Sequence, residues 1–207
     1  MDLSEESPVE ALLASIARCR LCAEQGYPIA VGPIACHNER RPDGTAEFVV
    51  IGQAPSLTDV RVGRTYRGPA GQRLVSWLRD AGFTDEEIGS RVWMTALTKC
   101  FPGRLPGKST DRAPSPAERA NCRPWLEREI ALLSPRVLIL FGKMAIDTFL
   151  SPAGPLDERI GRAFDVGGRI AIPLPHSSGA STWLNSLENQ ALLAKAIALI
   201  RSARDGN

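Results

Sequence analysis

The stretch that decides the fold is Val137-Leu138-Ile139-Leu140-Phe141, a run of consecutive apolar residues that is followed directly by Gly142. A short apolar run that lies between Pro135 and a glycine is typical of a strand buried on both faces of a sheet. Three other runs have the same character, and with the first they predict a central four-stranded sheet. They cover Phe48–Ile51, Val92–Leu97 and Ile170–Leu174.

Helical patterns separate these strands along the chain. The predicted helices lie around Trp77, from Ser115-Pro116 to Ser134, from Gly142 onward, and over residues 182–202. Strands that alternate with helices predict a mainly parallel sheet that is covered on both faces, with right-handed crossovers. The expected fold class is therefore α/β, as a three-layer α/β/α sandwich.

Ligands of such sheets bind beyond the carboxyl ends of the strands. This rule selects four loops as the candidate site: residues 52–71, 98–122, 142–145 and 175–185. The stretch from Val60 to Arg79 contains several arginines and no acid. Such a stretch either faces DNA phosphates or forms a solvated surface, and the sequence leaves both readings open.

The composition indicates one globular domain over residues 1–207. The chain is 43% hydrophobic and 23% charged, and its length suffices to bury a full core. Its apolar runs are far shorter than the roughly 18 residues of a membrane span, and its amino-terminal residues do not resemble a secretion signal. We therefore expect a cytoplasmic protein with no membrane contact. The net charge of +2 does not by itself indicate nucleic-acid binding.

Four of the cysteines form a pattern typical of a metal site. Cys19 and Cys22 make a Cys-x-x-Cys pair, and Cys100 and Cys122 follow much later. Because the cytoplasm is reducing, a metal site is favoured over disulfides. The spacing leaves zinc, an iron–sulfur cluster and ordinary buried cysteines open. Cys36 has no partner at a ligand-like spacing and is expected to be the spare.

Several motifs occur in an order that resembles one known family. They are Ile51–Ser56, Gly63–Gly71, Thr98–Pro102, Cys122–Leu126 with Pro135–Ala145, and Leu174–Gly179. They resemble, in turn, the first motif, the cysteine segments, the third strand and the His-Pro-Ser motif of the iron–sulfur uracil-DNA glycosylases. These glycosylases are families four and five of the uracil-DNA glycosylase superfamily, and the resemblance covers nearly the whole chain.

The resemblance implies a monofunctional DNA glycosylase of base excision repair, which flips uracil out of DNA and hydrolyses its N-glycosidic bond. It also implies an amino-terminal cluster-binding segment and a 4Fe-4S cluster held by Cys19, Cys22, Cys100 and Cys122. Four protein thiolates leave no iron site open, so this cluster is expected to be structural. The expected partner is DNA that contains uracil or another deaminated base, bound by a monomer in the nucleoid.

Breaking an N-glycosidic bond builds positive charge on the sugar and negative charge on the departing base. A neutral His176 at a strand end can stabilise the oxyanion of the base, and its motif makes it the expected catalytic donor. The resemblance places a carboxylate at Asp59, which we expect to orient the water and to counter the sugar cation. An exposed loop aspartate without a catalytic role is the alternative.

The resemblance further implies a base pocket formed by Gly52, Gln53, Ala54, Tyr66 and Ala96, with the ring of Tyr66 stacked on the flipped base. Phosphate contacts are expected from Pro55, Ser56, Ser177 and Ser178. Two positions depart from family four, because Gln53 replaces a Glu and Ala96 replaces an Asn that reads uracil. A site rejects analogues strongly only when its buried polar groups would be left unpaired. Ala96 therefore predicts that hypoxanthine and xanthine are accepted beside uracil.

Two alternatives remain open on the sequence. A damaged-DNA-binding iron–sulfur protein without catalysis would bind its DNA and release no base. A metal hydrolase or transferase acting on nucleotides would need an open metal position, for which His37 beside Cys36 is the candidate. No histidine lies between Cys100 and Cys122, so the covalent trapping of DNA found in one branch of the superfamily is not expected.

Overall fold

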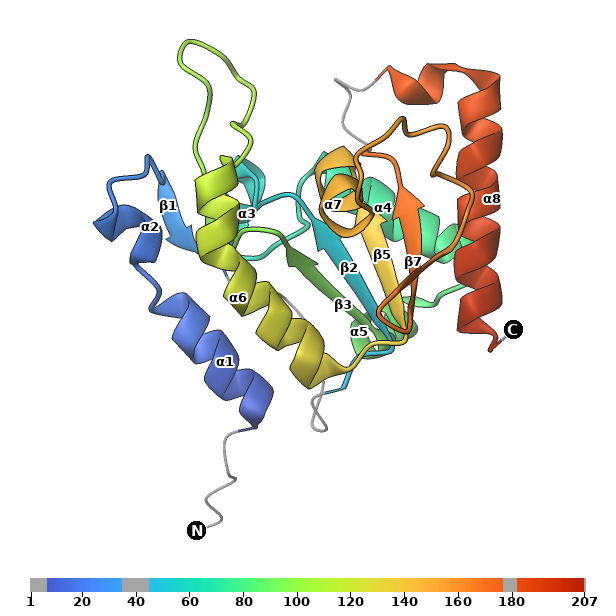
Figure 1. Ribbon diagram of the computed structural model, residues 1–207, viewed down its shortest axis with the longest axis horizontal. Coiled ribbons are helices and arrows are strands. Elements are labelled where there is room, and N and C mark those ends of the chain that lie inside the picture. Colours follow the sequence, from blue (N-terminus) through green and yellow to red (C-terminus); the bar gives the residue numbers. More distant parts are fainter. Residues whose placement is uncertain (1–6, 35–44, 177–181, 207) are drawn as a thin grey trace.

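A five-stranded sheet lies at the centre of the computed structural model, which describes residues 7–34, 45–176 and 182–206 (Figure 1). The strand order is β3-β2-β5-β7-β6, and the first four of these strands run parallel to one another. Their bounds are β2 (Phe48–Gly52), β3 (Val92–Ala96), β5 (Val137–Phe141) and β7 (Arg169–Leu174). The four predicted strands are present, and the prediction of a mainly parallel three-layer sandwich is confirmed.

Helices cover both faces of the sheet. Val137, Ile139 and Phe141 of β5 pack into the core on one face, whereas Leu138 and Leu140 pack into the core on the other. Over the first face lie α4 (Pro69–Asp80), α5 (Asp85–Arg91) and α8 (Leu187–Arg204). Over the second lie α1 (Pro8–Ala17), α6 (Pro116–Leu133) and α7 (Lys143–Phe149), with α1 beside α6 (Figure 1). Burial on both faces explains why the strands are apolar without alternation.

The predicted limits of α6 are confirmed by its capping geometry. The side chain of Ser115 accepts a hydrogen bond from the backbone nitrogen of Glu118, and Pro116 occupies the first turn. At the other end, Ser134 adopts the left-handed conformation with φ of 46°, which stops the helix. Local chemistry therefore sets both ends of α6.

Two short pairings join segments that the apolar runs did not predict. The fifth strand, β6 (Phe164–Val166), pairs antiparallel with β7 through Gly167 and Gly168, which have φ of 62° and 79°. A positive φ at both central positions is what a two-residue type I′ hairpin turn requires. A separate small sheet pairs β1 (Val31–Pro33) antiparallel with β4 (Cys100–Phe101). It fastens the amino-terminal segment to the loop that follows β3.

The remaining helices are short. They are α2 (Leu21–Glu24), α3 (Leu57–Val62) and the 3-10 helix η1 (Trp183–Asn185). Within the described ranges, none of the helices has the length and apolar character needed to cross a membrane.

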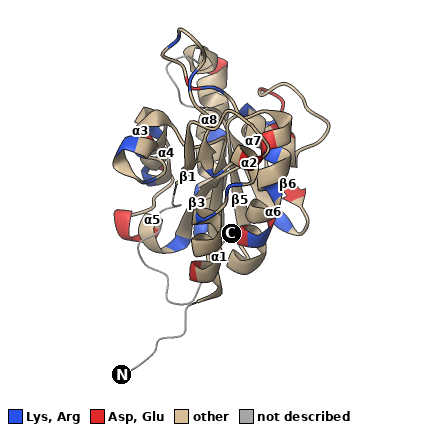
Figure 2. Ribbon diagram, turned by 90° about the vertical axis from the view of Figure 1, so that its left-hand side faces the viewer, with Lys and Arg blue, Asp and Glu red and all other residues tan. Residues whose placement is uncertain are grey.

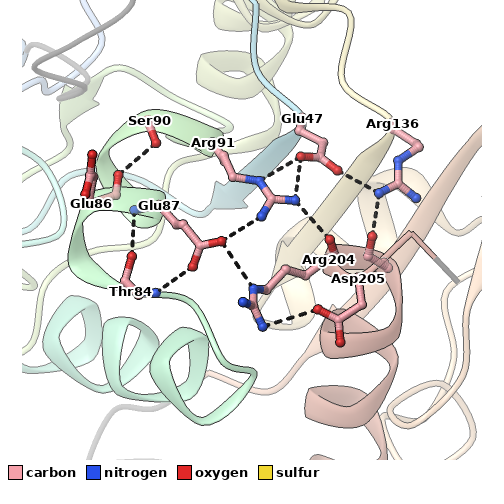
Figure 3. Close-up of polar contacts among 10 residues, drawn as sticks. Glu47, Thr84, Glu86, Glu87, Ser90, Arg91, Arg136, Arg204 and Asp205 are labelled. Carbon is pink, nitrogen blue, oxygen red and sulfur yellow. Dashed lines mark hydrogen bonds and ion pairs between the residues drawn. The ribbon is translucent and has the colours of Figure 1, made fainter.

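A network of ion pairs ties together the ends of the sheet where the parallel strands begin (Figure 3). The carboxylate of Glu47, which precedes β2, accepts hydrogen bonds from Arg91 at 2.8 Å and Arg136 at 2.7 Å. Arg91 also pairs with Glu87 at 2.8 Å, and Arg204 of α8 reaches the same Glu87 carboxylate at 3.4 Å. The network links α5, β2, β5 and α8 at the amino ends of the parallel strands, whereas the candidate site lies at their carboxyl ends.

Candidate active site

The carboxyl ends of the four parallel strands bring most of the predicted catalytic and base-binding residues to one edge of the sheet. Gly52 ends β2, Ala96 ends β3 beside it in register, Gly142 follows β5, and His176 follows β7. The segment between β2 and α4, which carries Asp59 in α3 and Tyr66 in the following loop, leaves the same edge. This gathering agrees with the binding position that the fold class predicts.

Tyr66 lies directly across the end of β2. Its hydroxyl donates a 2.6 Å hydrogen bond to the carbonyl of Thr95. A Cβ at Gly52 would lie 2.6 Å from that hydroxyl, and a Cβ at Gly71 would lie 2.1 Å from the Tyr66 carbonyl oxygen. The backbone of Tyr66 is left-handed with φ of 61°, a conformation that costs free energy in a non-glycine residue. Both motif glycines therefore make room for one constrained tyrosine.

His176 is held against the apolar floor of the site. Its ring stacks on Phe141 with centroids 5.2 Å apart and planes 29° apart, and Phe141 lies 6.4 Å from the ring of Tyr66. A Cβ at Gly142 would lie 3.2 Å from the imidazole, so this glycine permits the close approach of the backbone. Burial lowers the pKa of His176 below its usual value of 6.5. The imidazole is therefore neutral at neutral pH, as the predicted donor must be.

Asp59 is buried, at 5% exposure, and its carboxylate organises the loop around it. One oxygen accepts hydrogen bonds from the backbone nitrogen and the hydroxyl of Ser56, at 2.8 and 2.7 Å. The other oxygen accepts from the backbone nitrogen of Arg67 at 2.7 Å. These bonds form the capping box of α3 and close the loop onto the residue that follows Tyr66. The alternative of an exposed loop aspartate is therefore wrong, and the catalytic role stays a prediction.

The other predicted DNA and base contacts have mixed environments. The carbonyls of Gly52 and Gln53 accept bonds from the backbone nitrogens of Leu97 and Thr98, so these carbonyls continue the sheet. Ala54 is half-buried, Pro55 is buried, and the hydroxyl of Ser56 serves the cap of α3. Ser177 and Ser178 lie outside the described residues, as do Cys36 and His37.

Cys19, Cys22, Cys100 and Cys122 line one cavity of about 290 Å³ beside the small sheet. Cys22 lies in α2, Cys100 in β4 and Cys122 in α6, and all four cysteines are free thiols. Two donors point at their sulfurs: the backbone nitrogen of Lys99 at 3.3 Å from Cys122, and the side-chain amide of Asn121 at 3.6 Å from Cys22. The early cysteine pair and the two later cysteines therefore line the same cavity.

The lining of this cavity offers four thiols, which zinc and iron–sulfur clusters both accept as ligands. Within the described ranges, no three His, Cys, Asp or Glu side chains converge on one metal position. A cubane iron–sulfur cluster binds one thiolate at each corner, so its ligands surround a volume and do not meet at a point. Burial and the neighbouring thiols raise the pKa of Cys100 to about 12, and burial raises that of Cys122 to about 11. A bound cationic iron centre would instead lower the pKa of these thiols and favour the thiolates.

The loop between β4 and α6, which rises past the carboxyl ends of the strands in Figure 1, is anchored by one arginine. Arg112 donates to the carboxylate of Glu118 at 2.6 Å and to the carbonyls of Pro102 at 2.9 Å and Pro28 at 3.2 Å. The guanidinium of Arg112 lowers the pKa of Glu118 to about 2. Since Pro28 follows the first cysteine pair, this contact joins the loop to the cysteine segment.

A buried ion pair between Lys99 and Glu129 is the main feature of the site that motif reasoning missed. Both side chains are 1% exposed. A signal existed in the sequence, because Cys122, Leu126, Glu129 and Leu133 recur at helical spacing and are all buried. A glutamate on that apolar stripe requires a buried cationic or hydrogen-bonding partner.

Comparisons with known proteins agree with the geometry. Residues 40–201 match the family model described as "Uracil DNA glycosylase superfamily". The Type-4 uracil-DNA glycosylase of Thermotoga maritima is 29% identical over 133 residues, which cover 63% of this chain and 64% of the relative. The Type-5 uracil-DNA glycosylase of Mycobacterium tuberculosis is 29% identical over 153 residues, which cover 68% of this chain and 52% of the relative. The chain thus spans about half to two thirds of the length of these relatives.

Proposed function

Because the chain belongs to the uracil-DNA glycosylase superfamily, we propose that it hydrolyses the N-glycosidic bond of uracil in DNA, as a monofunctional enzyme of base excision repair. The observation that carries this proposal is the gathering of a neutral imidazole and a constrained aromatic ring at the carboxyl ends of β2, β3, β5 and β7. Such a site accepts a base that has been flipped out of the stack.

His176 is the proposed donor to the oxygen of the departing base. A neutral imidazole in a site of low polarity stabilises developing negative charge with little reorganisation, and stacking on Phe141 fixes its direction. The lowered pKa keeps the ring neutral, so its proton is shared with the leaving base as a hydrogen bond. The base then departs as a stabilised anion.

Tyr66 is the proposed wall of the base pocket. Its hydroxyl is committed to Thr95, so the ring has one orientation over Gly52. Backbone groups of Gly52, Gln53 and Ala54 are proposed to edge the base. Ala96 offers no side-chain amide to read uracil, so hypoxanthine and xanthine are proposed as further substrates.

Asp59 is proposed to act near the sugar, and its contacts define how. Its oxygens already hold Ser56 and the backbone of Arg67, so the carboxylate brings a fixed negative charge to the loop beside the pocket. This charge would counter the sugar cation and orient the attacking water through the remaining lone pairs. Asp59→Asn should keep the loop hydrogen bonds on one oxygen and lose the charge, whereas Asp59→Ala should lose both.

DNA binding is proposed for the surface around this loop. Arg61, Arg64, Arg67 and Arg73 are exposed there, and basic positions on α3 are visible in Figure 2. Guanidinium groups at this position would neutralise phosphates beside the flipped nucleotide. Further phosphate contacts are proposed for Pro55, Ser56, Ser177 and Ser178. The proposed setting is a monomer that acts in the cytoplasm on nucleoid DNA.

A 4Fe-4S cluster is proposed for the cysteine cavity, with Cys19, Cys22, Cys100 and Cys122 as its ligands. When bound, it would supply a structural link and no open iron site. The residues around it join α1, α2, β4 and α6, so ligand loss should cost folding before it costs chemistry. Iron content, sulfide content and a brown chromophore test this assignment, and a colourless protein that purifies with zinc would overturn it.

The activity is tested by base release from labelled oligonucleotides that contain one uracil, hypoxanthine or xanthine, in single- and double-stranded form. The wild type should release uracil, and His176→Ala should slow release by about a hundredfold or more, as for the loss of one donor to a developing anion. The folded, iron-containing state of both proteins is the control. No release by the wild type, with damaged-DNA binding retained, would favour a non-catalytic damage-binding protein.

A further inference from the structure

The pair of Lys99 and Glu129 stands out because both charges are removed from solvent. The Lys99 ammonium lies 2.5 Å from a Glu129 carboxylate oxygen, and each side chain is 1% exposed. Desolvating two such groups costs free energy that their attraction repays only when further hydrogen bonds are made. An apolar pair would fill the same space between β3 and α6 at no such cost.

The further hydrogen bonds all converge on the end of β3. The Lys99 ammonium donates to the Thr95 hydroxyl at 2.5 Å and to the Ala96 carbonyl at 2.9 Å. The Thr95 hydroxyl in turn donates to the Glu129 carboxylate at 2.8 Å. Hydrogen bonds from Lys99 therefore hold Thr95 and Ala96 in place, and Glu129 of α6 in turn holds Lys99.

Thr95 and Ala96 adjoin the proposed base pocket. The Thr95 carbonyl accepts the 2.6 Å hydrogen bond from Tyr66, the residue in left-handed backbone conformation. Ala96 ends the strand beside Gly52. The backbone nitrogen of Lys99 also donates to Cys122 of the cysteine cavity, so one residue contacts both regions.

We propose that Lys99, paired with Glu129, is a positioning residue for the base pocket: it fixes the Thr95 carbonyl and thereby holds the ring of Tyr66 over Gly52. This inference rests on the proposed function for its catalytic consequence, while the position of Tyr66 is measurable without substrate. Apolar side chains would be enough for packing alone, so the role of the two buried charges is to position Tyr66.

The first experiment measures the environment of Tyr66 in the full, iron-loaded chain. The sequence contains two tyrosines, Tyr27 and Tyr66, so labelling with 3-fluorotyrosine gives two fluorine NMR signals, which Tyr66→Phe assigns. Lys99→Met and Glu129→Gln should shift the Tyr66 signal and leave that of Tyr27 unchanged. Iron content confirms that the cysteine cavity is intact. An unmoved Tyr66 signal, or equal shifts of both signals, would overturn the proposal.

The second experiment separates positioning from stability. Lys99→Met/Glu129→Leu replaces the ion pair by an apolar pair, which should recover much of the melting temperature lost in Lys99→Met. The single-turnover rate of uracil release should stay about tenfold or more below the wild type, because the Thr95 clamp is still missing. Recovery of the rate together with the melting temperature would show that the pair is only structural.

A double-mutant cycle tests the route through Tyr66. If Lys99 acts through the hydrogen bond from Tyr66 to Thr95, Lys99→Met/Tyr66→Phe should be no slower than the slower single variant. Multiplied effects would contradict this route. Glu47→Gln, which removes charge from an ion-pair network at the opposite end of the sheet, is the matched control and should leave the rate unchanged. A wild type without base release would refute the proposed function, and the fluorine signals would still decide the role of Lys99.

Discussion

The two ends of the central sheet are held by ion pairs of opposite character. At the amino ends of the strands, Glu47, Glu87 and their arginine partners keep 25% to 42% of their side-chain surface exposed, and each carboxylate serves two arginines (Figure 3). At the carboxyl ends, Lys99 and Glu129 are each 1% exposed. Each exposed pair contributes little to the free energy of unfolding. Removal of one partner from a buried pair lowers that free energy far more, because it leaves an unpaired buried charge.

This difference separates the end of the sheet that secures the fold from the end that carries the candidate site. The exposed network contacts four elements, so we expect it to tolerate the loss of one bond because the others remain. The buried pair clamps Thr95 and, through it, a tyrosine with φ of 61°. Strained and buried polar groups are typical of functional regions, where position matters more than stability.

The largest effect is expected for Lys99→Met. Removing the ammonium leaves the Glu129 carboxylate buried without its cation, which should lower the free energy of unfolding by about 3–5 kcal/mol. Chemical denaturation of the iron-loaded protein measures this loss. Arg79→Gln, which breaks a pair whose side chains are 54% and 74% exposed, is the control and should be nearly neutral. Equal losses in the two variants would erase the contrast between buried and exposed pairs.

A glycine comparison sharpens the same contrast. In Gly71→Ala the new Cβ would meet the Tyr66 carbonyl at 2.1 Å, so we expect a loss of about 1–3 kcal/mol and slower base release. In Gly89→Ala, within α5, nothing lies within 4 Å, so we expect a gain of about 0.5–1 kcal/mol from helix propensity. Thermal unfolding measures whether stability falls in Gly71→Ala and rises in Gly89→Ala. A neutral Gly71→Ala would mean that Tyr66 is free to shift.

The rate of base release should depend on pH through the protonation of His176, which lies at the carboxyl ends of the strands. Its folded-state pKa is lowered from 6.5 by burial, so base release should persist below that pH and then fall about tenfold for each further unit of acidity. The unfolded chain takes up the proton first, so this residue also removes stability as pH drops from about 6.5 to the folded value. A rate–pH profile of wild type and His176→Ala separates the two effects. An acid limb unchanged in the variant would assign it to another group.

The smallest effect is expected for Glu47→Gln. The side chain loses its charge in a partly exposed network, and the amide oxygen of the glutamine still accepts a hydrogen bond, so the free energy of unfolding should fall by about 1 kcal/mol or less. High salt should shrink the difference further, because exposed charges are screened. A loss comparable to that of Lys99→Met would show that the network at the amino ends is as critical as the buried pair.

Much of this arrangement follows from local sequence patterns. The apolar runs located β2, β3, β5 and β7, and the Ser115-Pro116 start of α6 was readable because capping and proline preferences act within one turn. The strand-end rule selected the loops that contain Gly52 and His176, and the motifs that resemble the family made these two residues candidates. The short strand β6 was missed, since three alternating residues are too few to indicate a strand, and β6 is held by pairing with β7.

The sequence by itself determined the four parallel strands, the layers, the four cysteine positions and the candidate catalytic residues, because these depend on periodicity and on chemistry carried within single motifs. Only the tertiary structure decided that the cysteines line one cavity, that Asp59 caps its own loop, and that Lys99 meets Glu129 beneath Tyr66. Such pairings join residues far apart in the chain. Their partners are chosen by packing between elements, and no local pattern encodes that choice.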